Sequence, residues 1–154
     1  MLSKRGLERL GIRYKGYVIN SLSGAILRYE DEEVRIKSDE IKAYVLDRKG
    51  MAKSLYDEAK AAGAEISLGR RLSVKEILQL EREHEIIVGA DGAVSNVSRV
   101  FGFKQINEYV YTYKAEYGNA HVDDKHTVEL FFSNRISHRF FGWMAPYSGT
   151  EVEV

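Results

Sequence analysis

The stretch 41–69, IKAYVLDRKGMAKSLYDEAKAAGAEISLG, decides the fold class because its hydrophobic period changes twice. Apolar residues alternate with polar ones in IKAYVLD, which is typical of a strand. From Met51 onward, apolar residues recur at spacings of four, four and three, which predicts an amphipathic helix over 48–62 that ends at Gly63. AEISLG (64–69) then predicts a strand directly after the helix. A strand, a helix and a strand in this order favour a partly parallel sheet.

Shorter segments of period two lie on both sides of this unit. Their boundaries are Gly, Ser and Asp residues, which favour turns. We expect three preceding strands, in YKGYVINS (14–21), GAILRYED (24–31) and EEVRIKS (32–38). After the unit, SVKEILQLERE (73–83) fits either one helix or a short hairpin, and the sequence leaves both open. EIIV (85–88) predicts one more strand.

The last third of the chain is rich in aromatic residues with strand periodicity. Every second residue from 109 to 117 is a tyrosine or an alanine, and TVELFFSN and RFFGWMAP continue the alternation. We expect neighbouring antiparallel strands over 109–117, 127–132 and 139–145, whose aromatic face suits a flat or elongated apolar ligand. The predicted fold is therefore α/β or α+β, with two lobes, 1–104 and 105–154.

Composition excludes several classes of function. The 154 residues include 23 basic and 23 acidic side chains, and no basic arm is present, so nucleic acid is not an expected partner. The absence of cysteine excludes disulfides, thiolate nucleophiles and cysteine-ligated zinc. The first residues are too polar for a signal peptide, and no apolar run approaches the roughly 18 residues that span a bilayer. We expect a cytoplasmic protein whose membrane contact, if any, is peripheral.

The corner Ala-Asp-Gly after the strand 85–88 points to a ligand. Asp91 places a carboxylate at the carboxyl end of a strand, where open α/β sheets bind ligands, and Gly92 permits close approach of backbone or ligand. A helix that begins near Ser95 would offer free amide groups to an anion. Alternatively, Asp91 caps that helix and Gly92 makes the turn. The residues alone leave both interpretations open.

Polar clusters elsewhere give weaker signals. HVDDKH (121–126) combines imidazoles with carboxylates, which is a ligand set for zinc or iron. A polar loop between two strands is the better interpretation, so no metal site is predicted. His84 and His138 are isolated, and no Ser/His/Asp triad can be proposed from spacing. No catalytic side chain is therefore predicted.

Two ordered motifs resemble a known class of flavoproteins. VLDRKGMAKSLYDEAKAAGAEISLG (45–69), followed by IIVGADGAVSNVSRVFGF (86–103), resembles hydroxylases and reductases of the para-hydroxybenzoate hydroxylase type. In that class an arginine opens a helix that ends in Ala-x-x-x-Gly, and a later strand ends in Ala-Asp-Gly-x-x-Ser. The resemblance implies that Arg48, Asp91 and Gly92 contact FAD.

The tail VELFFSNRISHRFFGWMAP (128–146) is similar to the geranylgeranyl reductase branch of this class. In that branch, a strand of the form Tyr-x-Trp-x-Phe-Pro lines the pocket for an isoprenoid chain. Trp143 and Pro146 match the pattern, whereas Phe141 and Ala145 stand at its Tyr and Phe positions. The resemblance implies that Phe141, Trp143 and Pro146 line an apolar substrate pocket.

The resemblance covers nearly the whole chain but only the middle of the family's length. It implies a partial FAD-binding lobe over 1–104 and a partial antiparallel substrate-binding lobe over 105–154. The Gly-x-Gly-x-x-Gly turn that holds the FAD pyrophosphate does not occur in the sequence, nor does the later Gly-Asp segment. We therefore expect the chain by itself to bind FAD weakly or not at all. We also expect it to self-associate or to need flanking segments, because proteins tend to cover unpaired sheet edges.

Two functions of different class remain in view. In the first, the chain is the central piece of a FAD-dependent oxidoreductase that resembles geranylgeranyl reductases, and reduced flavin delivers hydride to an isoprenoid double bond of a lipid. In the second, the chain is a noncatalytic module that binds an apolar ligand or a partner and has lost the cofactor. The missing glycine fingerprint is the feature that separates these two functions.

Overall fold

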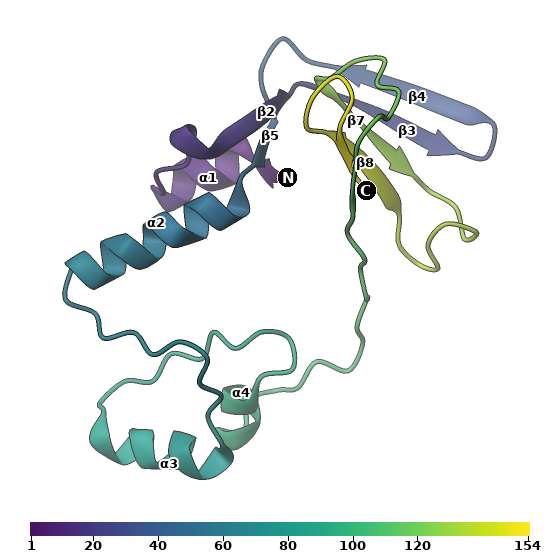
Figure 1. Cartoon of the computed structure of the whole chain (residues 1–154). Coiled ribbons are helices and arrows are strands. Elements are labelled where there is room, and N and C mark those ends of the chain that lie inside the picture. The colour runs from purple at the N-terminus through teal and green to yellow at the C-terminus, as the bar shows by residue number, and fades with distance from the viewer. The chain divides into compact units, whose positions relative to one another are not determined.

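The computed structural model describes all 154 residues and divides into two compact units. Unit 1 comprises residues 1–64 and 112–154, and unit 2 comprises residues 65–111 (Figure 1). Helices and strands both occur, so the α/β class predicted from the sequence is confirmed. The expected lobes, 1–104 and 105–154, do not coincide with these units, because strands from both lobes belong to one sheet.

A three-stranded antiparallel sheet in unit 1 has the strand order β1–β5–β2. Its strands are β1 (Leu2–Ser3), β2 (Val18–Leu22) and β5 (Ala43–Leu46). The helix α1 (Lys4–Leu10) and a short 3-10 turn (Lys15–Tyr17) connect β1 to β2. Strand β5 leads directly into the helix α2 (Arg48–Ala61), so the helix predicted over 48–62 is confirmed. It begins at Arg48 because the side chain of Asp47 accepts a hydrogen bond from the amide of Gly50 at 2.9 Å.

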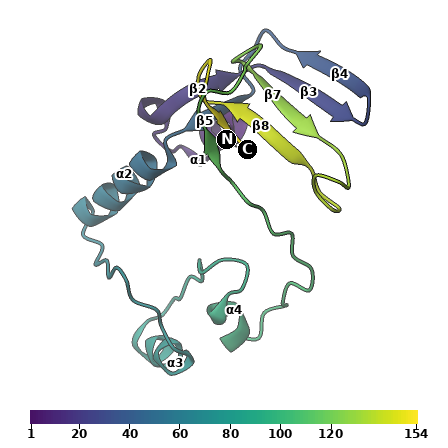
Figure 2. The ribbon, with the colours of Figure 1, turned by 45° about the vertical axis from the view of Figure 1, so that its right-hand side comes forward.

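A six-stranded sheet in unit 1 has the order β4–β3–β7–β8–β9–β6. Its strands are β3 (Gly24–Tyr29), β4 (Glu32–Lys37), β6 (Glu116–Tyr117), β7 (Thr127–Phe131), β8 (Gly142–Pro146) and β9 (Val152–Glu153). The pair β3–β7 is parallel, with Gly24 opposite Thr127, and the other pairs are antiparallel. The first and last residues lie close together in both views (Figure 1, Figure 2), and the amino group of Met1 is 3.8 Å from Glu153.

The strands expected in the last third are only partly correct. The strand over 127–132 is β7, and the strand over 139–145 begins later, at Gly142. Of the stretch 109–117, only Glu116 and Tyr117 form a strand, and they pair with β9 instead of β7. Tyr111 and Tyr113 are 92% and 83% exposed, so the alternating tyrosines do not make one packed face.

Strand β5 separates two hydrophobic clusters, because successive side chains of a strand point to opposite faces. Val45 is fully buried with Leu22, Val128 and Ala145, which joins the two sheets of unit 1. On the other face of β5, Leu46 packs with Leu7 and Tyr14, residues of α1 and the segment that follows it, and Met51 of α2 packs against them. The core of unit 1 therefore combines residues from both ends of the sequence.

Unit 2 contains two helices, α3 (Val74–Glu83) and α4 (Asn96–Val100). The helix alternative for 73–83 is thus the correct one. It is favoured by a capping box, in which the Ser73 side chain bonds the amide of Glu76 and the Glu76 side chain bonds the amide of Ser73. Ile77 of α3 is buried, at 3% exposure.

The strands predicted over 64–69 and 85–88 are wrong, because neither segment forms a strand. A strand is held by ladder hydrogen bonds to a neighbour, and no other strand in unit 2 supplies them. Leu68, Ile86 and Val88 are consequently 76%, 80% and 83% exposed. No helix of the chain combines the length and the apolar character that a bilayer crossing requires.

Candidate functional site

The Asp91–Gly92 corner is built around the start of α4 in unit 2. The carboxylate of Asp91 accepts hydrogen bonds from the amides of Asn96 and Val97, at 2.7 and 3.2 Å, and from the hydroxyl of Ser95. The Ser95 hydroxyl oxygen in turn accepts from the amide of Ser98 at 2.8 Å. These amides are therefore not free for an external anion, which corrects the expectation from the sequence. The capping interpretation describes the observed geometry.

The hydrogen bond from Ser95, with those from the two backbone amides, holds the pKa of Asp91 below its ordinary value. Asp91 is thus ionised at neutral pH. Gly92 has a φ of +85°, a backbone conformation that L side chains rarely adopt. A side chain at Gly89 would meet Val97 at 2.8 Å, so the segment also needs glycine where it passes α4.

A cavity of about 580 Å³ lies beside this corner, within unit 2. Its apolar lining includes Ile87, Val88, Val97, Phe101 and Phe103, and its polar lining includes Glu81, His84 and Ser95. The volume is in the range of about 300–1,000 Å³ that is typical of small-molecule sites. Asp91 itself is turned to α4 and does not line this cavity.

Arg48 lines a second cavity, of about 630 Å³, within unit 1. Arg48 is the first residue of α2 and is exposed, and no carboxylate lies within ion-pair distance of its guanidinium. Lys49 and Lys114 contribute two further positive charges to the lining, and Tyr117 and Tyr147 contribute aromatic rings and hydroxyls. A guanidinium without a carboxylate partner is suited to an anionic group such as a phosphate. Arg48 and Asp91, two of the residues predicted to contact FAD, belong to different units.

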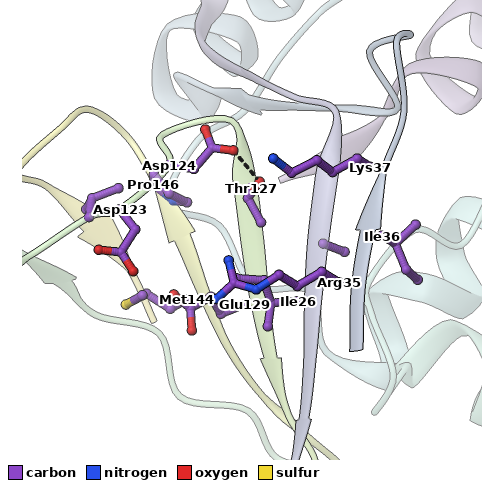
Figure 3. A pocket seen from close by; sticks show the side chains of 12 residues that line it. Ile26, Arg35, Ile36, Lys37, Asp123, Asp124, Thr127, Glu129, Met144 and Pro146 are labelled. Carbon is purple, nitrogen blue, oxygen red and sulfur yellow. Dashed lines mark hydrogen bonds between the residues drawn. The ribbon is translucent and has the colours of Figure 1, made fainter. Parts of the chain in front are cut away.

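Of the expected substrate residues, Trp143 and Pro146 lie on opposite faces of β8, and Phe141 precedes it. Pro146 is fully buried and, with Met144, lines a cavity of about 60 Å³ (Figure 3). In that cavity Asp124 accepts a hydrogen bond from the Thr127 hydroxyl at 2.8 Å. The space is enough for a few water molecules and far below the size of a lipid pocket.

Trp143 alternates with Met144 along β8 and packs against the buried cluster of Val45 and Ala145. Phe141 precedes the strand and stacks on Phe140, with ring centroids 4.4 Å apart. Trp143 and Pro146, the two positions that match the isoprenoid motif, therefore do not share one face of the strand.

A buried carboxylate lies on the face of β8 that carries Trp143. Glu153 of β9 is 5% exposed, and its Oε1 accepts a hydrogen bond from Nε1 of Trp143 at 3.3 Å. Its Oε2 accepts from the hydroxyl of Tyr147 at 3.1 Å and lies 2.7 Å from Nζ of Lys114. The Tyr147 hydroxyl is also 2.9 Å from a carboxylate oxygen of Glu116. We call these five residues the Glu153 cluster.

The pKa values in the Glu153 cluster reflect both burial and pairing. Burial opposes ionisation of Glu153, but the hydrogen bonds from Lys114 and Tyr147 and nearby positive charge outweigh it, so the pKa lies below its ordinary value. The hydrogen bond to Glu153 raises the pKa of Lys114. Burial raises the pKa of Tyr147 to about 12. At neutral pH the cluster therefore contains a charged Lys114–Glu153 pair and a neutral tyrosine hydroxyl.

Sequence reasoning did not find Lys114, Tyr147 or Glu153. The alternation in the last four residues, Glu-Val-Glu-Val, predicts that Glu153 points to solvent. In the structure β9 lies between β8 and β6, and both Val152 and Glu153 are buried. Strand periodicity gives no signal for such a site, because Lys114, which pairs with Glu153, lies 39 residues before it in the sequence.

The histidine-rich segment 121–126 is a polar loop. His121 is 2.8 Å from Asp123, and Asp124 accepts from the amide of His126. Nδ1 of His126 lies 2.8 Å from the carbonyl oxygen of Ser21. No group of three or more His, Asp or Glu side chains in the structure is arranged to hold a metal ion.

Comparison with known proteins gives distant relatives. No protein-family model matches the chain, and no solved structure matches it. An uncharacterized protein of Methanocaldococcus jannaschii is 31% identical over 167 aligned positions, which cover the whole chain and 42% of that protein. A second relative, from Methanococcoides burtonii, is 28% identical over 158 positions, which cover 91% of the chain and 37% of that protein. It is digeranylgeranylglycerophospholipid reductase 2.

The chain thus has a distant and partial relationship to a geranylgeranyl-type reductase. It spans about two fifths of the length of these curated relatives.

Proposed function

We propose that the chain is the central part of a FAD-dependent oxidoreductase that reduces isoprenoid double bonds of a lipid. The observation that carries this proposal is the similarity over 91% of the chain to a digeranylgeranylglycerophospholipid reductase. The activity in the name of that relative is the one that the motif match at Trp143 and Pro146 implies. When bound and reduced, the flavin of FAD would supply the hydride.

The surroundings of Arg48 fit one part of such a cofactor. The guanidinium is always charged, has no carboxylate partner and lines a cavity of about 630 Å³ with Lys49 and Lys114. We assign Arg48 to a phosphate or to the ribityl region of FAD. The corner at Asp91 fits less directly, because both carboxylate oxygens already accept hydrogen bonds from Ser95 and α4. Its assigned role is to fix the Asp91–Gly92 turn that would face the cofactor.

These contacts are too few for tight binding by the chain alone. Even two charge-assisted hydrogen bonds from the guanidinium of Arg48 would contribute only about 1.5–3 kcal/mol each, which corresponds to affinities on the order of millimolar. The purified chain is therefore expected to be colourless or to bind FAD only weakly, as equilibrium dialysis would measure. Recovery of stoichiometric FAD with the purified chain would contradict this expectation.

A hybrid protein tests the proposed activity. The matched 37% of the M. burtonii reductase would be replaced by this chain, so that the relative supplies the flanking segments. We expect the hybrid to bind FAD and, with dithionite added as the reductant of the flavin, to saturate double bonds of digeranylgeranylglycerophospholipid, with the gain of hydrogen followed by mass spectrometry.

Within the hybrid, Arg48→Ala is expected to weaken FAD binding by roughly tenfold to hundredfold, because a charged hydrogen bond is lost. Asp91→Ala is expected to weaken it as well. Lys53→Ala is the matched control, since Lys53 lies on the same helix and pairs with Asp57. If neither Arg48→Ala nor Asp91→Ala changes the affinity of the hybrid for FAD, the cofactor assignments are wrong.

The noncatalytic alternative predicts a different result. A folded hybrid that binds a geranylgeranyl lipid but neither binds FAD nor reduces the lipid would support an apolar-ligand-binding module that has lost the cofactor.

A further inference from the structure

We propose that Glu153 is a positioning residue for Trp143, and that it holds the indole in the orientation in which an isoprenoid chain packs against it. The ligand in this proposal rests on the proposed function. The fixed orientation of the indole rests only on the contacts within unit 1.

Burial of the Glu153 carboxylate costs free energy. Glu153 is 5% exposed and its neighbour Val152 is 3% exposed, so the strand end lies in the interior of the sheet. A buried ion pair is seldom more stabilising than an apolar residue of similar volume. Stability by itself therefore gives no reason for a glutamate at this position, whereas fixing a neighbouring polar side chain does.

The two carboxylate oxygens of Glu153 have different hydrogen-bond partners. Oε1 accepts the indole hydrogen bond from Trp143 at 3.3 Å, and Oε2 is taken by Lys114 at 2.7 Å and Tyr147 at 3.1 Å. Lys114 and Tyr147 therefore fix the carboxylate plane, and Oε1 accepts the indole hydrogen bond with the amino group of Met1 3.8 Å away. A carboxylate held from one side in this way orients the indole better than a freely rotating side chain would.

Trp143 and Glu153 lie on the same face of the β8–β9 pair. Ala145 is directly opposite Glu153 in the β8–β9 pair, and Trp143 lies two residues before Ala145 on the same face. Trp143 is half-buried and packs against the buried cluster of Val45 and Ala145. Lys114 and Tyr147 also line the cavity of about 630 Å³, so the residues that hold Glu153 are accessible from that cavity.

Trp143 is the only tryptophan of the chain, which makes the proposal directly measurable. Its fluorescence can be excited at the red edge, where tyrosine does not absorb, and its indole gives one N–H signal in an NMR spectrum. Geranylgeraniol in detergent micelles serves as the isoprenoid probe, and quenching of Trp143 fluorescence reports its binding.

Two substitutions at one position separate orientation from charge. Glu153→Gln keeps an acceptor oxygen and should leave the emission spectrum, the anisotropy and the geranylgeraniol affinity of Trp143 within about twofold of the original. Glu153→Leu removes the acceptor and should lower the anisotropy and weaken geranylgeraniol binding by about tenfold, the loss expected for one hydrogen bond. Glu151→Leu is the matched control, because Glu151 is an exposed glutamate two residues away.

A measurement on the unsubstituted chain keeps the proposal falsifiable if Glu153→Leu does not fold. The indole N–H signal should shift in one step as acid protonates Glu153. The charged or titratable groups that face Glu153 are Lys114, Tyr147, Glu116 and the amino group of Met1, 3.8 Å away. Glu116 is the one other carboxylate of the Glu153 cluster, and Glu116→Gln leaves Glu153 as its only carboxylate.

The outcomes distinguish the two proposals. An indole signal that does not respond to acid, or a folded Glu153→Leu protein with unchanged anisotropy, overturns the positioning role. Absence of quenching by geranylgeraniol while the indole signal follows Glu153 would contradict the isoprenoid ligand and leave the orientation of Trp143 established.

Discussion

Unit 1 and unit 2 differ in how their apolar residues are buried. In unit 1, strands from the first 46 residues and from residues 116–153 enclose buried clusters on both faces of β5. In unit 2, Ile77 is the one buried apolar side chain, and Ile86 and Val88 remain 80% and 83% exposed. The difference shows that sequence-distant strand pairing, rather than local hydrophobic pattern, produces the core of this chain. Stability should therefore be concentrated in unit 1.

The largest effect is expected from a cavity in the core of unit 1. Leu22 is 2% exposed and packs with Val45, Val128 and Ala145. Leu22→Ala should lower the free energy of unfolding of unit 1 by about 2–5 kcal/mol, because it removes buried apolar area and leaves a void. Chemical denaturation followed by Trp143 fluorescence measures this change.

A matched control for this prediction is Leu10→Ala, since Leu10 is 70% exposed and should change the free energy by less than about 0.5 kcal/mol. Amide exchange in α3 should be unaffected by Leu22→Ala if the two units are independent. Loss of exchange protection in α3 of that variant would show that the stability of unit 2 depends on the core of unit 1.

A smaller effect is expected from the buried charge pair. Lys114→Met removes the nearer of the two ammonium groups that face buried Glu153, which should cost about 1–2 kcal/mol after allowance for the partial exposure of Lys114. In the unsubstituted chain the pKa of Glu153 is depressed, so its contribution is present above pH 4.5, its ordinary pKa, and is lost as pH falls through the folded value.

In Lys114→Met the burial of Glu153 is no longer offset by that ion pair, so stability should begin to fall at a higher pH. Denaturation midpoints between pH 7 and pH 4 measure the shift, with Lys125→Met as a control for loss of one exposed lysine. Identical pH profiles for Lys114→Met and the unsubstituted chain would contradict the pairing described for the Glu153 cluster.

The smallest effect is expected in unit 2, where a cap rather than a core supports α3. Ser73→Ala removes one half of the capping box and should cost the helix about 1 kcal/mol. The hydrogen bonds from Ser73 and Arg70 lower the pKa of Glu76 to about 2. The support that Glu76 gives to α3 is therefore present above pH 4.5 and is lost as pH falls toward 2.

Amide exchange of α3 as a function of pH measures both effects, and Lys75→Ala is the control because Lys75 is exposed and takes no part in the cap. If the amides of α3 remain protected from exchange both in Ser73→Ala and in acid, unit 2 is stabilised by more packing than Ile77 alone provides.

The sequence predicted the elements whose stability is local. The helix from Arg48 to Ala61 has its cap in Asp47 and its apolar spacing in adjacent turns, so no distant residue is needed to recognise it. The hairpin of β3 and β4 likewise joins neighbours in sequence. The segments 64–69 and 85–88 have the residue pattern of strands, but the structure gives them no neighbouring strand to pair with. The residue pattern of a segment carries no information about whether such a neighbour exists.

The candidate site, like the fold, was predicted only where its residues are close in sequence. The Ala-Asp-Gly corner and its alternative role as a cap could both be derived from residues close in sequence. The Glu153 cluster could not, because Lys114, Trp143 and Glu153 meet only when β6, β8 and β9 are assembled side by side. A buried charge in a strand contradicts the periodicity that sequence reasoning depends on.

The parallel pairing of β3 with β7 has a consequence for synthesis of the chain on the ribosome. Gly24 pairs with Thr127, which the ribosome adds roughly 100 residues later. Synthesis of that length takes about 5 to 20 s at ordinary elongation rates. During that time β3 and β4 can already form their hairpin, while the other edge of β3 is open to nascent chain or chaperone. Unit 2 emerges within the same interval, so its helices can form before the sheet of unit 1 closes. Folding of unit 1 should accordingly be slow and late, in contrast to helices that need only their own neighbours.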